Sequence, residues 1–86
     1  MPEISRFLGI VIHMFYDDHN PPHFHARYGE TKGVFEISTL NMLEGTLPAK
    51  VRGLIAEWAD IHREALLEDW DLAQSGCVPK KIMPLV

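Results

Sequence analysis

Three of the five histidines in this 86-residue chain lie in one short segment, residues 17–25, which reads DDHNPPHFH. The side chains in it that can exchange protons or bind a metal are Asp17, Asp18, His19, His23 and His25. Histidine titrates near neutral pH, and its neutral imidazole is a common ligand for transition metals. The two prolines of the segment restrict the backbone between the histidines. Residues 17–25 are therefore the candidate site.

A metal site is the first hypothesis for this segment. Residues i and i+2 of a strand point to the same side, so the imidazoles of His23 and His25 can converge on one ion. Asp18 and His19, from the preceding loop, are the candidate further ligands. Imidazole and carboxylate are ligands that zinc accepts, so zinc is the natural candidate for a bound metal.

Two other hypotheses assign the segment different roles. A nucleic-acid-directed enzyme would use the three histidines as its active site, with His23 and His25 as catalytic acid and base. Arg27 and Lys32 would then bind phosphate groups or a partner. A noncatalytic interaction module would instead dock a small protein on its polar sheet face or its helix end, with His23 paired to Glu36.

The residues around the segment show the two-residue period of strands. Even positions from 7 to 16 are apolar, which predicts one strand with Leu8 and Tyr16 on the core face. Residues 23–28 predict a second strand. A two-residue turn beginning at Gly29 leads into a third strand over residues 31–38, and a short fourth strand is expected over 42–44.

The turn at Gly29 sets the register of the hairpin. It places Phe24 opposite Phe35 on the core face, and His25 opposite Val34 on the polar face. His13 should point to the same polar face if the first two strands are neighbours.

A long helix is predicted over residues 48–75, with Pro48 as its first residue and Gly76 just beyond its end. Its apolar residues at helical spacing are Val51, Leu54, Ile55, Trp58, Ile61, Ala65 and Leu66. A helix of this length is about 42 Å long, more than a short sheet can cover. We therefore expect Trp70 and Leu67 to overhang the sheet, where they either fold back onto the C-terminal tail or contact another chain. The specific prediction is that Trp70 binds a partner and is buried only in an oligomer or complex.

The tail, residues 77–86, should lie near the acidic end of this helix. The acidic side chains there are Glu64, Glu68, Asp69 and Asp71. Lys80 and Lys81 are the nearest candidates to offset their charge, and residues 81–85 form a candidate edge strand.

Composition sets the class of protein. A chain of 86 residues with 47% hydrophobic residues suits one small α+β domain, a three- or four-stranded antiparallel meander with one helix on one face. A net charge of −4 argues against general binding to RNA or DNA. The single cysteine, Cys77, excludes an internal disulfide. No membrane span or signal peptide is recognisable, and a cytoplasmic location is expected.

The sequence resembles a bacterial family called domain of unknown function 4160 along nearly its whole length. The resemblance is carried by PEISRF at residues 2–7, GIVI at 9–12, DHNPPHFH at 18–25, LEG at 43–45, Leu47-Pro48, Trp58, His62-Arg63 and KIMPL at 81–85. The chain departs from the family pattern at residues 39–41, where an Asp-Gly turn is usual, and at His13, where an aromatic residue is usual.

The resemblance implies a biological setting. Members of the family are often encoded beside a second small protein, and such pairs look like toxin-antitoxin modules. The chain is therefore expected to act with a small partner encoded by a neighbouring gene, as the toxin-like member of the pair. Self-association is also expected as an alternative.

Overall fold

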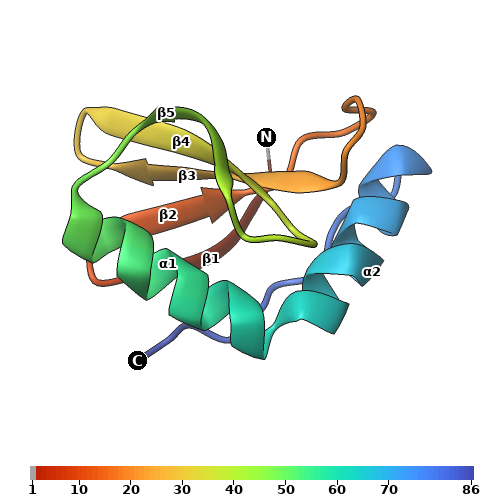
Figure 1. Cartoon of the computed structure of the whole chain (residues 1–86). Coiled ribbons are helices and arrows are strands. Elements are labelled where there is room, and N and C mark those ends of the chain that lie inside the picture. The colour runs from red at the N-terminus through yellow and green to blue at the C-terminus, as the bar shows by residue number, and fades with distance from the viewer. Residues whose placement is uncertain (1) are drawn as a thin grey trace.

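The computed structural model describes residues 2–86, which form a five-stranded antiparallel sheet and two helices (Figure 1). The strands are β1 (Glu3–Phe7), β2 (Ile10–His13), β3 (His23–Tyr28), β4 (Thr31–Glu36) and β5 (Met42–Thr46), in that order across the sheet. Helix α1 (Ala49–Ile61) lies across one face of the sheet, and α2 (Arg63–Gln74) approaches the loop between β2 and β3. The predicted α+β class and meander order are confirmed, with more strands and helices than expected.

One aromatic side chain of α1 holds the sheet and the C-terminal segment together. The indole ring of Trp58 contacts Phe24 of β3 and Phe7 of β1, with ring centroids 5.8 and 5.5 Å apart. Its Nε1–H donates a hydrogen bond of 2.8 Å to the carbonyl of Met83. The buried indole therefore has its polar atom satisfied while its ring fills the core.

No helix in residues 2–86 is long and apolar enough to cross a membrane.

The predicted register of the β3–β4 hairpin is confirmed at every pair. Phe24 lies opposite Phe35 and their rings stack with centroids 5.5 Å apart, while His25 lies opposite Val34. Gly29 has a φ of +60°, as the first residue of the predicted turn requires. His13 lies opposite His25 in the β2–β3 pair, so the expected neighbours are confirmed.

The prediction of one strand over residues 7–16 is wrong. The chain reverses at Leu8 and Gly9, which both have positive φ, and forms the β1–β2 hairpin. Leu8 is 55% exposed in this turn, and Tyr16 is also exposed, in the loop after β2. Apolar residues on both sides of the turn continue the alternation, so the pattern conceals the reversal.

The prediction of one continuous helix over residues 48–75 is also wrong. The backbone leaves helical geometry at His62, where φ is −109° and ψ is 25°. Helix α2 therefore folds back towards the end of the sheet, and Trp70 is only 5% exposed in the isolated chain. The expectation that Trp70 overhangs and is buried only in an oligomer is therefore wrong. The sequence did not reveal the break, because His62 is neither a proline nor a glycine.

The end of α2 and the tail agree more closely with expectation. Gly76, with a φ of +77°, follows the helix, and Cys77 N–H donates a hydrogen bond to the carbonyl of Leu72. This is the Schellman motif, a common way for helices to end. Lys80 forms an ion pair of 2.9 Å with Glu68. The tail adds no strand among the described residues, although Ile82 N–H donates a 2.7 Å hydrogen bond to the carbonyl of Ile4. Lys81 Nζ donates another of 2.7 Å to the carbonyl of Glu3.

Replacing Phe35 with alanine tests the register. The ring is buried against Phe24, so its loss should reduce the free energy of unfolding by about 3–5 kcal/mol. Tyr28→Ala, at the exposed end of the same hairpin, should cost less than about 1 kcal/mol. Chemical denaturation of the three proteins measures both values, and equal losses in the two variants would contradict the observed packing.

Asp69 should make stability depend on pH. Its side chain is 1% exposed; Oδ1 accepts a hydrogen bond from Lys80 N–H, and Oδ2 has no partner among the described residues. Burial raises the pKa of Asp69, so between the ordinary and the raised pKa the unfolded chain binds fewer protons than the folded one. Stability contributed by this carboxyl therefore falls as pH rises through that interval.

Asp69→Asn keeps an oxygen for Lys80 N–H and removes the buried charge. The unfolding free energy of the variant, relative to the parent, should increase as pH is raised from about 4 to about 7. Asp71→Asn, an exposed carboxylate on the same helix, serves as the control and should show no such trend. Curves for Asp69→Asn that run parallel to the parent across this range would refute the assignment.

Candidate metal centre

The loop between β2 and β3 is fixed at both ends. Asp17 has a φ of +48°, and its N–H donates to the carbonyl of Ala73 in α2 at 3.3 Å. The carbonyl of Pro22 accepts a 3.0 Å hydrogen bond from Ile37 N–H, and the Asn20–Pro21 peptide bond is cis. These contacts return the loop over the start of β3.

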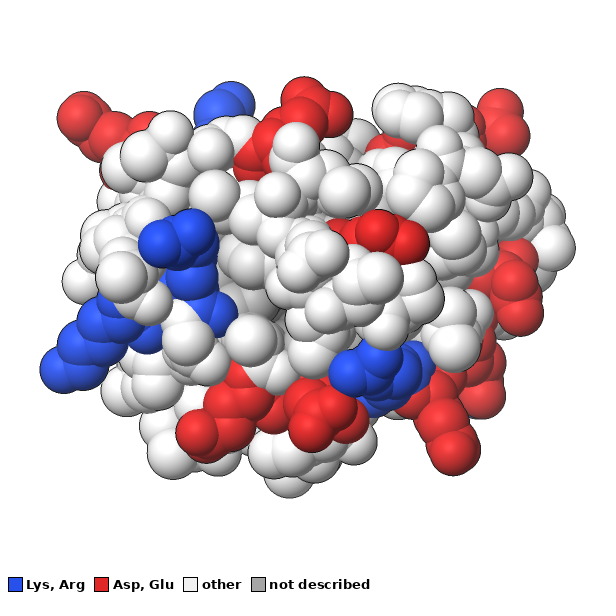
Figure 2. All heavy atoms as spheres, viewed as in Figure 1, with Lys and Arg blue, Asp and Glu red and all other residues white. Residues whose placement is uncertain are grey.

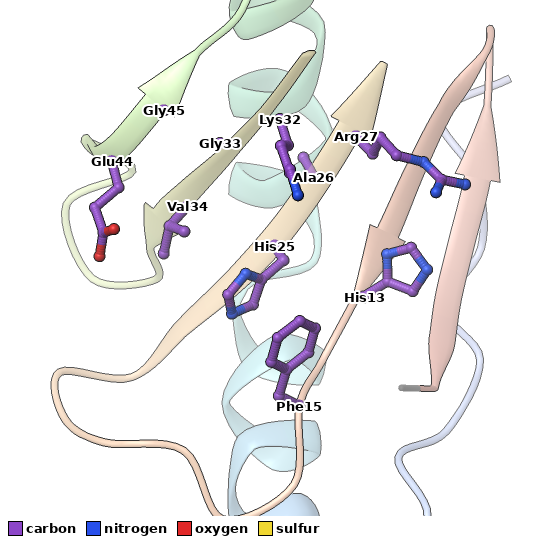
Figure 3. A pocket seen from close by; sticks show the side chains of 10 residues that line it. All are labelled: His13, Phe15, His25, Ala26, Arg27, Lys32, Gly33, Val34, Glu44 and Gly45. Atoms are coloured by element: carbon purple, nitrogen blue, oxygen red, sulfur yellow. The ribbon is translucent and has the colours of Figure 1, made fainter. Parts of the chain in front are cut away.

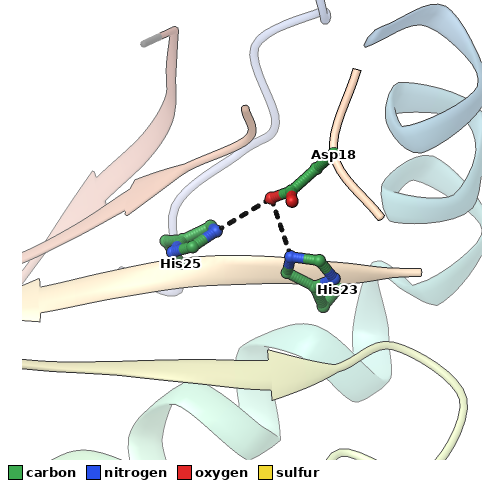
Figure 4. A group of neighbouring side chains, drawn as sticks. All are labelled: Asp18, His23 and His25. Atoms are coloured by element: carbon green, nitrogen blue, oxygen red, sulfur yellow. Dashed lines mark hydrogen bonds and ion pairs between the residues drawn. The ribbon is translucent and has the colours of Figure 1, made fainter. Parts of the chain in front are cut away.

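This loop brings one carboxylate onto two histidines (Figure 4). Oδ2 of Asp18 lies 2.8 Å from Nε2 of His23 and 3.3 Å from Nε2 of His25. The three possible ligand atoms lie within 4.8 Å of one another. Ligand atoms bonded to a tetrahedral zinc ion at about 2.0–2.1 Å are about 3.3 Å apart, so modest side-chain adjustments would fit this set to an ion.

The second nitrogen of His23 has a fixed role. Nδ1 lies 2.7 Å from the carbonyl oxygen of Pro21, which can only accept, so Nδ1 carries a proton and donates it. In a neutral imidazole Nε2 is then an acceptor, yet it faces the Asp18 oxygen, which is also an acceptor when ionised. A proton or a metal cation between the two atoms is required to make this contact attractive.

Aromatic contacts hold both rings. His25 stacks on Phe15, with centroids 3.8 Å apart and planes 5° from parallel. His23 is 4% exposed and packs against the indole of Trp70, with ring centroids 5.1 Å apart. These contacts direct the Nε2 atoms of His23 and His25 towards Asp18.

The charges of the site also favour metal binding. Burial opposes ionisation of Asp18, but hydrogen bonds from the His19 backbone, His25 and His23 outweigh it and lower the pKa of Asp18. Burial lowers the pKa of His25, with partial opposition from Asp18. An ionised carboxylate beside a neutral imidazole is the state in which these groups bind metals.

The remaining predicted ligands lie less favourably. His19 has a side chain 83% exposed, and its Nδ1 is 3.0 Å from the other oxygen of Asp18, outside the group of three. His23 and Glu36 are opposed in the backbone, but Glu36 accepts hydrogen bonds from Ser38 and Thr39. The predicted side-chain pair of His23 and Glu36 is therefore wrong.

A groove on the sheet face opposite α1 adjoins the histidines (Figure 3). Its volume is about 370 Å³, and the side chains that matter for its chemistry are those of His13, Phe15, His25, Arg27, Lys32 and Glu44. Arg27 and Lys32, predicted to bind phosphate or a partner, lie at this groove, whereas Trp70 lies in the core. Burial, and then the charge of Arg27, lower the pKa of His13.

Sequence reasoning missed Phe15, which stacks on His25 and lines the groove. Its place at an odd position after β2 was the available signal, since an aromatic side chain there would not face the core.

Charge is not concentrated on the face shown in Figure 2. Basic side chains form small, separated groups there, with acidic side chains between and around them. This face therefore offers no continuous basic surface of the kind that binds a nucleic-acid backbone.

Comparison with known proteins assigns a family. A family model described as Domain of unknown function (DUF4160) matches residues 9–71. No curated protein and no solved structure matches the chain. The matched range includes Asp18, His23 and His25, and it spans well over half of the 86 residues. The chain therefore belongs to the DUF4160 family.

Proposed function

We propose that this protein binds a divalent transition metal, with zinc as the reference ion, through Oδ2 of Asp18 and Nε2 of His23 and His25. The observation that carries the proposal is the orientation of His23. Its Nδ1–H is held by the Pro21 carbonyl, so its Nε2 points at a carboxylate oxygen 2.8 Å away, a contact that needs either a proton on Nε2 or a metal ion. A metal ion that displaces this proton would form bonds to both atoms.

The surroundings of the three ligands support this proposal. Histidine ligands of metals usually donate their second N–H to a carbonyl or carboxylate, as His23 does to Pro21. The stack on Phe15 orients His25 in a similar way. Ligand orientation therefore exists before any ion binds.

The number of ligands indicates the kind of site. Zinc sites that serve only structure have four protein ligands, whereas catalytic ones have three and keep a position for water or substrate. Asp18, His23 and His25 supply three. A metal held in this way would act as a Lewis acid or lower the pKa of a bound water.

The other expectations stay predictions. Neither the fold nor the family match tests them. They are the small neighbouring partner, the toxin-like role, self-association, action on nucleic acid and a cytoplasmic location. A metal site is compatible with each of them, because its ligands occupy only one corner of the sheet.

Metal titration of purified, chelator-treated protein tests the site. Calorimetry should show one Zn²⁺ per chain, and Co²⁺ should give the visible absorption of a low-coordinate ion. Asp18→Asn and His25→Gln should each weaken Zn²⁺ binding at least about tenfold, since each removes a ligand or its charge. Asp17→Asn, which alters the adjacent carboxylate, is the matched control and should bind like the parent. Equal binding by all four proteins would disprove the ligand set.

Stability offers a second readout. An ion that binds only the folded chain raises the free energy of unfolding by about 2.7 kcal/mol at a free concentration of 100 times Kd. Zn²⁺ should therefore raise the melting temperature of the parent and of Asp17→Asn, and EDTA should reverse the rise. A similar rise in Asp18→Asn would place the ion elsewhere.

A further inference from the structure

We infer that the groove on the open sheet face is a binding site for a small phosphate ester, whose phosphate lies between Arg27 and Lys32. The phosphate contact does not require the metal. Only the position of the ligand beside a metal rests on the function proposed above.

The charge pair at the groove is the first argument. Arg27 and Lys32 lie directly opposite each other on β3 and β4, and both side chains are exposed. Like charges at opposed positions destabilise a sheet. Among residues 2–86 neither side chain has a carboxylate within 4.0 Å, whereas Arg6, Arg63 and Lys80 each form an ion pair. An anion between the two cations would turn their repulsion into two attractive contacts.

The shape and lining of the groove indicate the rest of the ligand. Its volume of about 370 Å³ falls in the range of about 300–1,000 Å³ found for small-molecule sites. Figure 3 shows Lys32 at one end, with Arg27 beside it and its guanidinium extended away over β2, Phe15 at the other end, and Val34 and Glu44 along one side. Phe15 and Val34 can contact an apolar or aromatic group, and the Glu44 carboxylate can accept a hydrogen bond from a hydroxyl or amine.

The same features favour a small ester over a polymer. Two permanent cations suffice for one phosphate, whereas a nucleic-acid strand requires a row of them along its backbone. The chain also carries a net charge of −4, which does not favour a polyanionic strand. A compound of the size of a nucleoside monophosphate matches both the volume and the charge.

His25 connects the groove to the metal centre. Its ring lines the groove, and its Nε2 faces Asp18. A ligand in the groove therefore lies next to the proposed metal, and binding of the two should be coupled. Such coupling is reciprocal: a change in ester affinity caused by Zn²⁺ must equal the change in Zn²⁺ affinity caused by the ester.

Calorimetry with AMP, adenosine and inorganic phosphate as probes tests the groove, first in EDTA and then with Zn²⁺. The parent should bind AMP in EDTA, and adenosine should bind at least about tenfold more weakly, because it lacks the phosphate. The double variant Arg27→Gln, Lys32→Gln should lose AMP affinity at least about tenfold and keep its Zn²⁺ affinity. In the same solutions, the NMR signals of His13 and His25 should shift with AMP in the parent.

The matched control removes the same charge elsewhere. Lys50→Gln, Arg52→Gln alters two exposed cations of α1 and should bind AMP like the parent. Equal losses in the two double variants would overturn the proposal, since AMP would then respond to overall charge. Binding of a phosphorylated RNA oligomer without binding of AMP would also overturn it, in favour of a polymer.

The two proposals fail separately. Asp18→Asn should lose Zn²⁺ and still bind AMP in EDTA. AMP binding that requires Zn²⁺ and is absent from Asp18→Asn would overturn the Arg27–Lys32 site and leave the metal site standing. AMP binding by a protein that takes up no Zn²⁺ would support the groove and refute the metal proposal.

Discussion

The buried ring of His23 is the contact through which the loop, the sheet and the second helix depend on one another. Its Nδ1 donates to the Pro21 carbonyl, its Nε2 faces Asp18, and its ring contacts that of Trp70 at an angle. Leaving one buried polar atom without a partner costs about 1–3 kcal/mol. The loop therefore cannot move away from β3 without a penalty, and the ligand atoms stay together for reasons of folding.

The two faces of the sheet have different roles. On one face Phe24 packs against both Phe35 and Trp58, and this face supplies the core. The other face carries His25 and the opposed cations Arg27 and Lys32, an arrangement that folding alone does not favour. Residues that oppose local stability are expected where a protein binds something, and here they adjoin the three candidate metal ligands.

The metal and the groove would complement each other chemically. A metal with an open coordination position polarises an oxygen ligand, and nearby cations stabilise the negative charge of a phosphate. Membership of the DUF4160 family shows relationship without assigning chemistry, and the proposed function follows from these side chains alone. A small partner, expected from the resemblance to toxin-antitoxin pairs, would have to contact surfaces beyond this corner or cover it.

The sequence by itself determined the β3–β4 hairpin and the common face of His23 and His25, because alternation and a glycine turn act between near neighbours. It did not reveal the hairpin reversal at Leu8 or the helix break at His62, since apolar spacing continues through both. Only the tertiary structure decided that Asp18, and not His19, completes the group with His23 and His25, and that Trp70 packs against His23. Both depend on where α2 meets the loop, through contacts such as Asp17 N–H to the Ala73 carbonyl. Contacts between segments so far apart in the chain leave no local pattern.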